Sequence, residues 1–265
     1  MPKIHTNGIK TYYEWIGEGP PLLLISGLGQ SQQFWQHLTP LWSEQFRLLT
    51  FDNRGMGQTE SPRLPYTVET LAQDALGLLD ALALESVYLL GHSLGAAVAF
   101  EIARRQPRRV QKLMMVSGLY PGPQFVATSP QTVKAMTIGF GKFKHVIEQG
   151  VRVVTSPTFP TKQPQFFNQM VEARLQAKSM MGQVARQWAA GTAYLVTDKL
   201  KQPFNIPLSL VYGADDQIAL PANGQNIQTR LPGTKLQLIP EAGHMVPLEQ
   251  PVIFADLVKD WFRAE

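Results

Sequence analysis

The fold is decided by one stretch of the chain, Val87-Tyr88-Leu89-Leu90-Gly91-His92-Ser93-Leu94-Gly95-Ala96-Ala97. The apolar residues up to Leu90 predict a buried strand and the residues after Leu94 predict a helix, so only a very sharp turn fits between them. Ser93 lies at the tip of that turn. Gly91 and Gly95 flank it because Cβ atoms there would collide where the strand folds onto the helix. The pattern G-x-S-x-G between a strand and a helix therefore predicts an exposed serine hydroxyl at the carboxyl edge of a sheet.

A serine hydroxyl at this place has the surroundings that a nucleophile needs. Backbone N–H groups and the helix dipole favour negative charge at the amino end of the helix that follows Ser93. The hydroxyl is a poor nucleophile unless a base takes its proton, and the base needs an acid that fixes its tautomer. Such a site therefore requires a histidine and an acid that reach the same sheet edge.

His244 is the candidate base. It is one of five histidines and lies in a loop directly after the last predicted strand, Lys235–Ile239. The adjacent residues Asp215 and Asp216 follow another buried strand, so one of them is expected to point inward and the other outward. Asp52 also ends a strand, but the Asn53-Arg54-Gly55 that follows favours a structural turn bonded to backbone groups.

An oxyanion that forms on an attacked carbonyl needs two backbone N–H donors. The first is expected from Leu94, the residue after the serine, at the start of its helix. The second is expected from the flexible loop Ser26-Gly27-Leu28-Gly29, which follows the buried strand Leu22–Ile25. We assign it to Leu28.

Strands and helices alternate up to Gly118, and this alternation predicts a parallel sheet with helices on both faces. The alternation then breaks and resumes after Gln202, with proline-punctuated helical sequence between. We therefore expect an α/β core at residues 1–118 and 203–265, interrupted by a helical cap, or lid, at 119–202. Because strand order resumes cleanly after the insertion, we expect the sheet not to depend on it. The cap is expected over the carboxyl ends of the strands, where ligands bind in such sheets.

The composition excludes several classes of protein. The chain has 265 residues, 44% of them hydrophobic, and a formal charge of +4. No run approaches the roughly 18 apolar residues of a membrane span, and no Lys/Arg cluster resembles a nucleic-acid stripe. There is no cysteine, so no thiolate nucleophile, disulfide or Cys-based metal site is available. We expect a cytoplasmic protein, a monomer or homodimer, that needs no metal or cofactor and binds neither membrane nor nucleic acid.

The motifs together resemble an α/β-hydrolase fold serine hydrolase over nearly the whole chain. By motif, the chain is most similar to the small-lactone and ester hydrolases of the 3-oxoadipate enol-lactonase-like branch. The segments that carry the resemblance are Ser26-Gly27-Leu28-Gly29, Asp52-Asn53-Arg54-Gly55-Met56-Gly57, Gly91-His92-Ser93-Leu94-Gly95, Tyr212-Gly213-Ala214-Asp215-Asp216 and Ala242-Gly243-His244. Many relatives carry histidine where this chain has Ser26.

The resemblance implies a function and a set of site residues. In that family the acid stands three residues after the strand-ending glycine, which selects Asp216 over Asp215 and completes a Ser93, Asp216, His244 triad. Epoxide hydrolases and haloalkane dehalogenases use an aspartate nucleophile, so Ser93 argues against both branches. We expect a cofactor-independent hydrolase of small, partly apolar esters or lactones, a carboxylesterase or lactonase that forms an acyl-enzyme. The expected substrate contacts are Gly27, Trp35, His92 and Met245.

Two other functions fit the same residues. A small-ligand receptor or signalling module of this fold can keep an intact triad, and carbon–carbon bond hydrolysis can use the same triad.

The predicted cap has an excess of basic residues, because residues 119–202 hold ten Lys/Arg and three Asp/Glu. Such an excess is typical of solvated surface, which is the interpretation that we favour. The alternative is a positive lid that draws in a carboxylate-bearing substrate.

Overall fold

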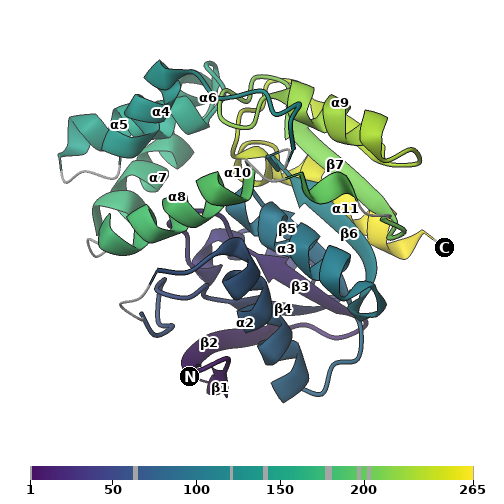
Figure 1. Cartoon of the computed structure of the whole chain (residues 1–265). Helices are drawn as coiled ribbons and strands as arrows, with labels where there is room; N and C mark the ends of the chain where they lie inside the picture. The colour runs from purple at the N-terminus through teal and green to yellow at the C-terminus, as the bar shows by residue number, and fades with distance from the viewer. Residues whose placement is uncertain are drawn as a thin grey trace.

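An eight-stranded sheet forms the centre of the molecule (Figure 1). The computed structural model describes residues 2–61, 65–119, 122–139, 143–176, 181–195, 198–201 and 204–264. The strand order is β1-β2-β4-β3-β5-β6-β7-β8, with β1 and β2 antiparallel to their neighbours and all the others parallel. The strands are β1 (Lys3–Thr6), β2 (Ile9–Ile16), β3 (Pro21–Ile25), β4 (Arg47–Phe51), β5 (Val87–His92), β6 (Val110–Val116), β7 (Leu208–Gly213) and β8 (Lys235–Ile239). The predicted α/β architecture is confirmed.

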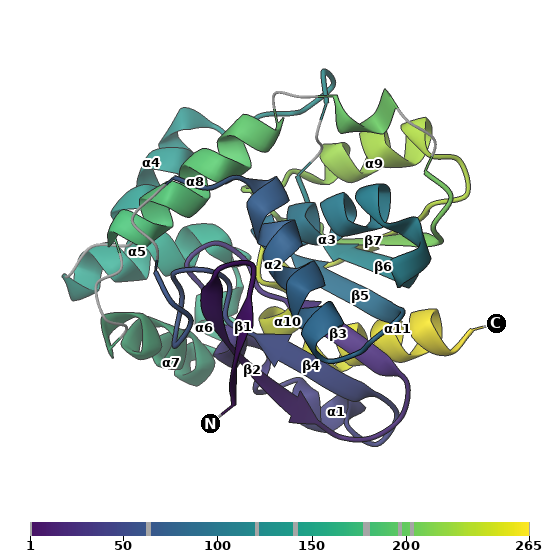
Figure 2. The same ribbon diagram turned by 60° about the horizontal axis from the view of Figure 1, so that its bottom comes forward.

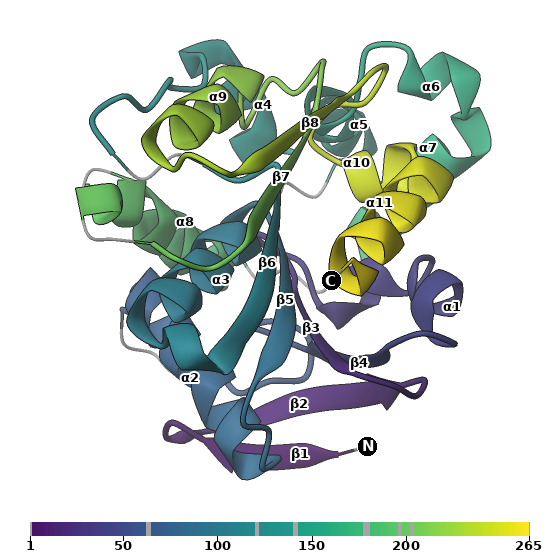
Figure 3. The same ribbon diagram turned by 90° about the vertical axis from the view of Figure 1, so that its right-hand side faces the viewer.

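Helices cover both faces of this sheet, as the edge-on view shows (Figure 3). One face carries α2 (Val68–Ala81), α3 (Leu94–Arg105) and α9 (Pro221–Arg230). The other carries α1 (Thr39–Trp42) and α11 (Pro251–Arg263), next to the short α10 (Val246–Glu249). Short 3₁₀ helices complete the core at η1 (Gln32–Trp35), η2 (Pro107–Arg109) and η3 (Lys199–Lys201). None of the described helices is both long and apolar enough to cross a membrane.

The central strands are buried on both faces because their sequences are apolar throughout. Leu23 and Leu89 belong to the apolar cluster under α2 and α3, whereas Leu22 and Leu24 belong to the cluster under α1 and α11. A strand that is buried on only one face would instead alternate apolar and polar residues.

In the described part of the segment between β6 and β7 there are five α-helices, which lie in the region expected to be the cap and are called the cap helices. They are α4 (Pro130–Ile138), α5 (Lys144–Val154), α6 (Phe159–Lys162), α7 (Pro164–Gln176) and α8 (Met181–Leu195). Figure 2 shows α4, α5 and α7 standing beside the sheet at one end of the molecule, with α8 reaching across toward α2. The helices α5 and α7 share an apolar cluster that contains Ile147, Val151, Phe167 and Val171.

The helix α8 packs into the large apolar cluster on the α2 and α3 face of the sheet. Ala190 and Tyr194 are buried in the same apolar cluster as α2 and α3, and the Tyr194 hydroxyl donates a hydrogen bond of 2.9 Å to the buried carboxylate of Glu101 on α3. The packing of α8 therefore argues against the expectation that the sheet is independent of the whole insertion, because a buried carboxylate of the core has one of its hydrogen-bond partners on this helix.

Candidate active site

Ser93 lies at the junction of β5 and α3, at the carboxyl edge of the sheet. Its backbone has a φ of 54° and a ψ of −118°, a conformation that a non-glycine residue rarely adopts. The Ser93 N–H holds this turn by donating to the Val116 carbonyl at 2.9 Å. A Cβ atom on Gly91 would clash with the Gly95 carbonyl, and one on Gly95 would clash with the Ile25 carbonyl. The predicted reason for both glycines is thus confirmed.

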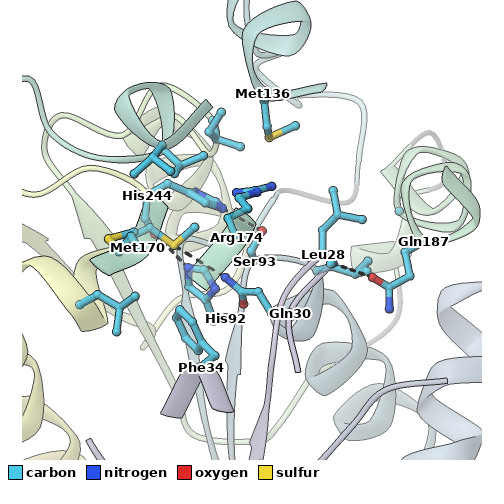
Figure 4. A pocket seen from close by; sticks show the side chains of 18 of the residues that line it. Leu28, Gln30, Phe34, His92, Ser93, Met136, Met170, Arg174, Gln187 and His244 are labelled. Atoms are coloured by element: carbon cyan, nitrogen blue, oxygen red, sulfur yellow. Dashed lines mark hydrogen bonds between the residues drawn. The ribbon is translucent and has the colours of Figure 1, made fainter. Parts of the chain in front are cut away.

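His244 connects Ser93 to Asp216 by two hydrogen bonds. The His244 Nδ1 lies 2.9 Å from Asp216 Oδ2, and its Nε2 lies 2.8 Å from Ser93 Oγ. An ionised carboxylate only accepts hydrogen bonds, so Nδ1 carries the proton and Nε2 accepts from the Ser93 hydroxyl. Figure 4 shows the His244 and Ser93 side chains facing the same cavity. The structure therefore brings these three residues together, with the imidazole in the tautomer that can take a proton from Ser93.

The two adjacent acids separate as expected. Asp216 is buried, and its second oxygen, Oδ1, accepts the N–H groups of Ile218 at 2.8 Å and Ala219 at 2.9 Å. Asp215 is exposed. Asp52, at the end of β4, is also buried and accepts backbone N–H bonds from Gln32 and Gln58, which confirms its structural role.

The two residues whose backbone amides are expected to bind an oxyanion, Leu28 and Leu94, line the same cavity as Ser93. Leu94 is the first residue of α3, where N–H groups have no partner within the helix. In the loop after β3, the Gly27 N–H donates to the Gln30 side chain and the Gly29 N–H to the Gln187 side chain, each at 2.8 Å. The Leu28 N–H between them makes no hydrogen bond within the described part of the chain. It is the amide of this loop that remains for a ligand.

His92 and Met245 line the cavity, as predicted for substrate contacts. His92 is fully buried and stacks on Phe34, with ring centroids 4.7 Å apart. Its Nε2–H donates to the His244 carbonyl oxygen at 2.9 Å, which ties the histidine loop to β5. Burial, together with the neighbouring His244, lowers the pKa of His92 to about 3. His92 is thus a neutral support of the His244 loop as well as part of the cavity wall.

Gly27 and Trp35, the other two residues expected to contact the substrate, lie outside the cavity wall. Neither is among the described residues that line the cavity. The Trp35 side chain is fully buried in the apolar cluster beneath η1, with its ring centroid 6.5 Å from that of Trp42. Gly27 is buried within the loop after β3, where an added Cβ atom would lie 3.1 Å from the Cβ of Ser93. The sequence placed both residues near Ser93 but carried no information on the direction in which they face.

The cavity above Ser93 has a volume of about 1060 Å³ and a mainly apolar wall. Residues of the core and of the cap both contribute to it, including Phe166 and Ile218. Figure 4 labels Leu28, Phe34, Met136 and Met170 among them. Within the described residues, no group of three or more His, Asp or Glu side chains is arranged to hold a metal ion. The cavity is large enough for a small-molecule substrate.

Sequence reasoning missed three polar residues of this site. The Glu249 carboxylate is buried and accepts the N–H groups of Gly243 and Met245, on either side of His244. Gln187, on α8, accepts the Gly29 N–H, and Arg174, on α7, lines the cavity. Glu249 is the only one with a local signal, since it is a single acid in the apolar segment that follows His244. The other two lie on cap helices, whose position over the sheet the sequence does not encode locally.

Comparison with known proteins places this chain in a family. The family model described as alpha/beta hydrolase fold matches residues 20–251. The chain belongs to the α/β hydrolase family. It is a hydrolase of that fold, and this membership favours an enzyme over a receptor.

Three relatives illustrate the range of this family. The chain is 27% identical to a putative carbamate hydrolase of Agrobacterium fabrum over 252 residues, which covers 89% of this chain and 90% of the relative. Its fold is similar to that of a thermophilic esterase from Thermogutta terrifontis, with a TM-score of 0.82, 24% identity and coverage of 99% and 97% of the two chains. It is also similar to the enol-lactonase from Burkholderia xenovorans LB400, with a TM-score of 0.83, 22% identity and coverage of 99% and 100%.

Proposed function

We propose that this protein is a serine hydrolase that cleaves carboxylic esters or lactones of small, partly apolar substrates through an acyl-enzyme. Ser93 is the nucleophile, His244 the general base and acid, and Asp216 the acid that orients His244. The Leu28 and Leu94 N–H groups bind the oxyanion. Residues 119–202 act as the cap that roofs the acyl pocket.

The reaction follows from the hydrogen bonds at the site. His244 Nε2 takes the proton of the Ser93 hydroxyl while Oγ attacks the carbonyl carbon, and the carbonyl oxygen becomes an oxyanion. When the oxyanion collapses, the alcohol leaves with the proton from Nε2, and the acyl group stays on Oγ. A water molecule then attacks the ester on Ser93, gives its proton to Nε2, and releases the acid as the proton returns to Oγ.

The hydrogen-bonded series from Ser93 through His244 to Asp216, opening on an apolar cavity, is the observation that carries this proposal. The esterase and the enol-lactonase with the same fold support an ester-type bond as the substrate. The carbamate hydrolase relative makes carbamates the nearest competing class, so the substrate panel must contain one.

The first experiment is labelling of the purified protein with a fluorophosphonate, followed by peptide mass spectrometry and a panel of p-nitrophenyl esters, lactones and a carbamate. We expect one adduct, on Ser93, and turnover of short-chain esters or lactones. Ser93→Ala is expected to lose the adduct and to lower kcat by about 10⁴-fold or more, because removal of a triad nucleophile leaves only binding and the oxyanion site.

Ser31→Ala is the matched control, because Ser31 is a second serine in the cavity wall. It is expected to keep both the label and the activity. Ester turnover that survives in Ser93→Ala, or an adduct on another serine, would overturn the assignment. Cleavage of the carbamate but of no ester would move the substrate class to that of the Agrobacterium relative.

A further inference from the structure

Arg174 is a charged group in the cavity that the proposed reaction does not use. It comes from α7 of the cap, and Figure 4 shows its guanidinium inside the cavity, pointing toward Ser93 and His244. Of the described residues that line the cavity, Arg174 is the one with a Lys or Arg side chain, and none is Asp or Glu. The described cavity wall thus combines an apolar surface with one fixed positive charge.

Four other described basic residues of the cap do not line the cavity. Lys134, Lys144 and Lys162 are exposed, and Lys199 is paired with Glu69 of α2 at 2.7 Å. These four residues fit the solvated-surface interpretation of the basic excess in the cap. Arg174 does not fit it, because its head group is inside the molecule.

The surroundings of Arg174 favour an anionic ligand. Burial lowers the pKa of Arg174 to about 10, so the guanidinium is still protonated at neutral pH but lacks much of the hydration it would have in water. An anion restores the lost solvation, and charge-assisted hydrogen bonds are stronger in an apolar cavity than at a surface. A guanidinium has five N–H donors, so a contact with the protein leaves donors for a ligand.

We propose that Arg174 is the subsite for a carboxylate group of the substrate, so that the preferred substrates are esters or lactones that carry a carboxylate a few carbons from the attacked carbonyl. A single guanidinium matches the charge of a monoanion, and its planar fork matches the two oxygens of a carboxylate. This inference names the substrate class of the proposed serine hydrolase and rests on that function for its kinetic test.

The kinetic test compares two p-nitrophenyl esters of similar length, the anionic hydrogen glutarate and the neutral hexanoate. The quantity measured is the ratio of their kcat/KM values at pH 7.5. Arg174→Gln is expected to lower the ratio by 10- to 100-fold, the range that corresponds to about 1.5–3 kcal/mol for a hydrogen bond to a charged group. Arg174→Lys keeps the charge and is expected to retain part of the ratio.

Lys134→Gln is the matched control, because it removes a positive charge from the exposed surface of the same cap. Its ratio is expected to stay within threefold of the wild-type value. A ratio that falls equally in Lys134→Gln and Arg174→Gln would assign the preference to the overall charge of the cap, and a ratio that Arg174→Gln leaves intact would also overturn the subsite.

A binding test separates this inference from the hydrolase itself. Calorimetry with Ser93→Ala compares monomethyl glutarate, an anion, with the neutral dimethyl glutarate. We expect the anion to bind at least tenfold more tightly, and the preference to disappear in Ser93→Ala/Arg174→Gln. If the wild type hydrolyses no ester but this preference is found, the proposed reaction fails and the subsite stands. Equal affinity for the two ligands would overturn the subsite, whatever the activity.

Discussion

At Asp216 the two carboxylate oxygens have separate tasks. Oδ2 accepts from His244 Nδ1, and Oδ1 accepts two backbone N–H groups that fix the carboxylate in place. An asparagine in this position has only one acceptor oxygen. If the amide NH₂ group faces His244, the imidazole loses its Nδ1–H tautomer. If the NH₂ group faces the N–H groups of Ile218 and Ala219 instead, donors point at donors.

We therefore expect Asp216→Asn to lower kcat by about 10⁴-fold, the loss found for the equivalent change in a serine protease. Asp215→Asn is the control, since Asp215 is adjacent in sequence but exposed, and it is expected to keep kcat within about threefold. Steady-state kinetics on the best ester of the panel would measure both. A severe loss in Asp215→Asn with a mild one in Asp216→Asn would contradict the assignment of the acid.

Glu249 gives the stability of the protein a specific dependence on pH. Burial raises the pKa of Glu249 from 4.5 to about 7, although the N–H groups of Ser156, Gly243 and Met245 favour its ionised form. Between these two values the folded state binds more protons at this group than the unfolded chain, so this contribution to stability falls as pH rises through the window.

The expected result for Glu249 is a difference between two proteins. From pH 4.5 to pH 8, the free energy of unfolding of the wild type should fall by about 3 kcal/mol relative to that of Glu249→Gln, which cannot titrate. Urea denaturation at several pH values would measure the difference. Parallel pH profiles for the two proteins would show that the pKa of Glu249 is not raised.

At the scale of the elements, the turn between β5 and α3 depends on close backbone contact. A Cβ atom on Gly95 meets the backbone of Ile25, which cannot move without shifting β3. Gly95→Ala is therefore expected to lower the free energy of unfolding by about 2 kcal/mol or more, as overpacked sites do. Gly182→Ala is the control, because Gly182 lies on α8 with open space around its Cβ position. That change is expected to stabilise the protein by up to about 1 kcal/mol.

The link from α8 to the loop after β3 connects the cap to the oxyanion site. Gln187→Leu removes the acceptor of the Gly29 N–H, next to the Leu28 amide. A misplaced oxyanion donor stabilises the transition state less well but has little effect on substrate binding. We therefore expect kcat to fall by about 10- to 100-fold with little change in KM. Gln183, one turn earlier on α8, contacts Ser61 instead, so Gln183→Leu is expected to keep kcat. A change in KM alone would show that Gln187 acts only on substrate binding.

At the scale of the whole molecule, the cap consists of two parts that differ in how they pack. The helices α5 and α7 have their own apolar cluster, whereas α8 supplies Ala190 and Tyr194 to the main core. Replacing residues 130–176 by a Gly/Ser linker should leave a folded but less stable core, because the buried Glu249 carboxylate loses the Ser156 N–H. This core should also associate, because Ile218 and Met245 lose the cap residues that cover them.

A longer deletion, of residues 121–199, also removes α8 and leaves the buried Glu101 carboxylate without the Tyr194 hydroxyl. We expect this protein to unfold at a clearly lower urea concentration than the shorter deletion, with size-exclusion chromatography to record association in both. Equal urea midpoints would mean that the sheet does not depend on α8.

The sequence by itself determined the sheet, the turn at Ser93 and the convergence of His244 and an acid on it, while the choice of Asp216 over Asp215 followed from the family resemblance. These features are local: apolar runs form strands, glycines allow the close turn, and parallel strands end at one edge, so residues such as Asp216 and His244 that follow strand ends must converge. Only the tertiary structure decided which way Trp35 faces, which amides Glu249 and Gln187 hold, and that Arg174 enters the cavity. Each of these depends on how helices distant in sequence pack over the sheet, and a short sequence pattern carries no record of that packing.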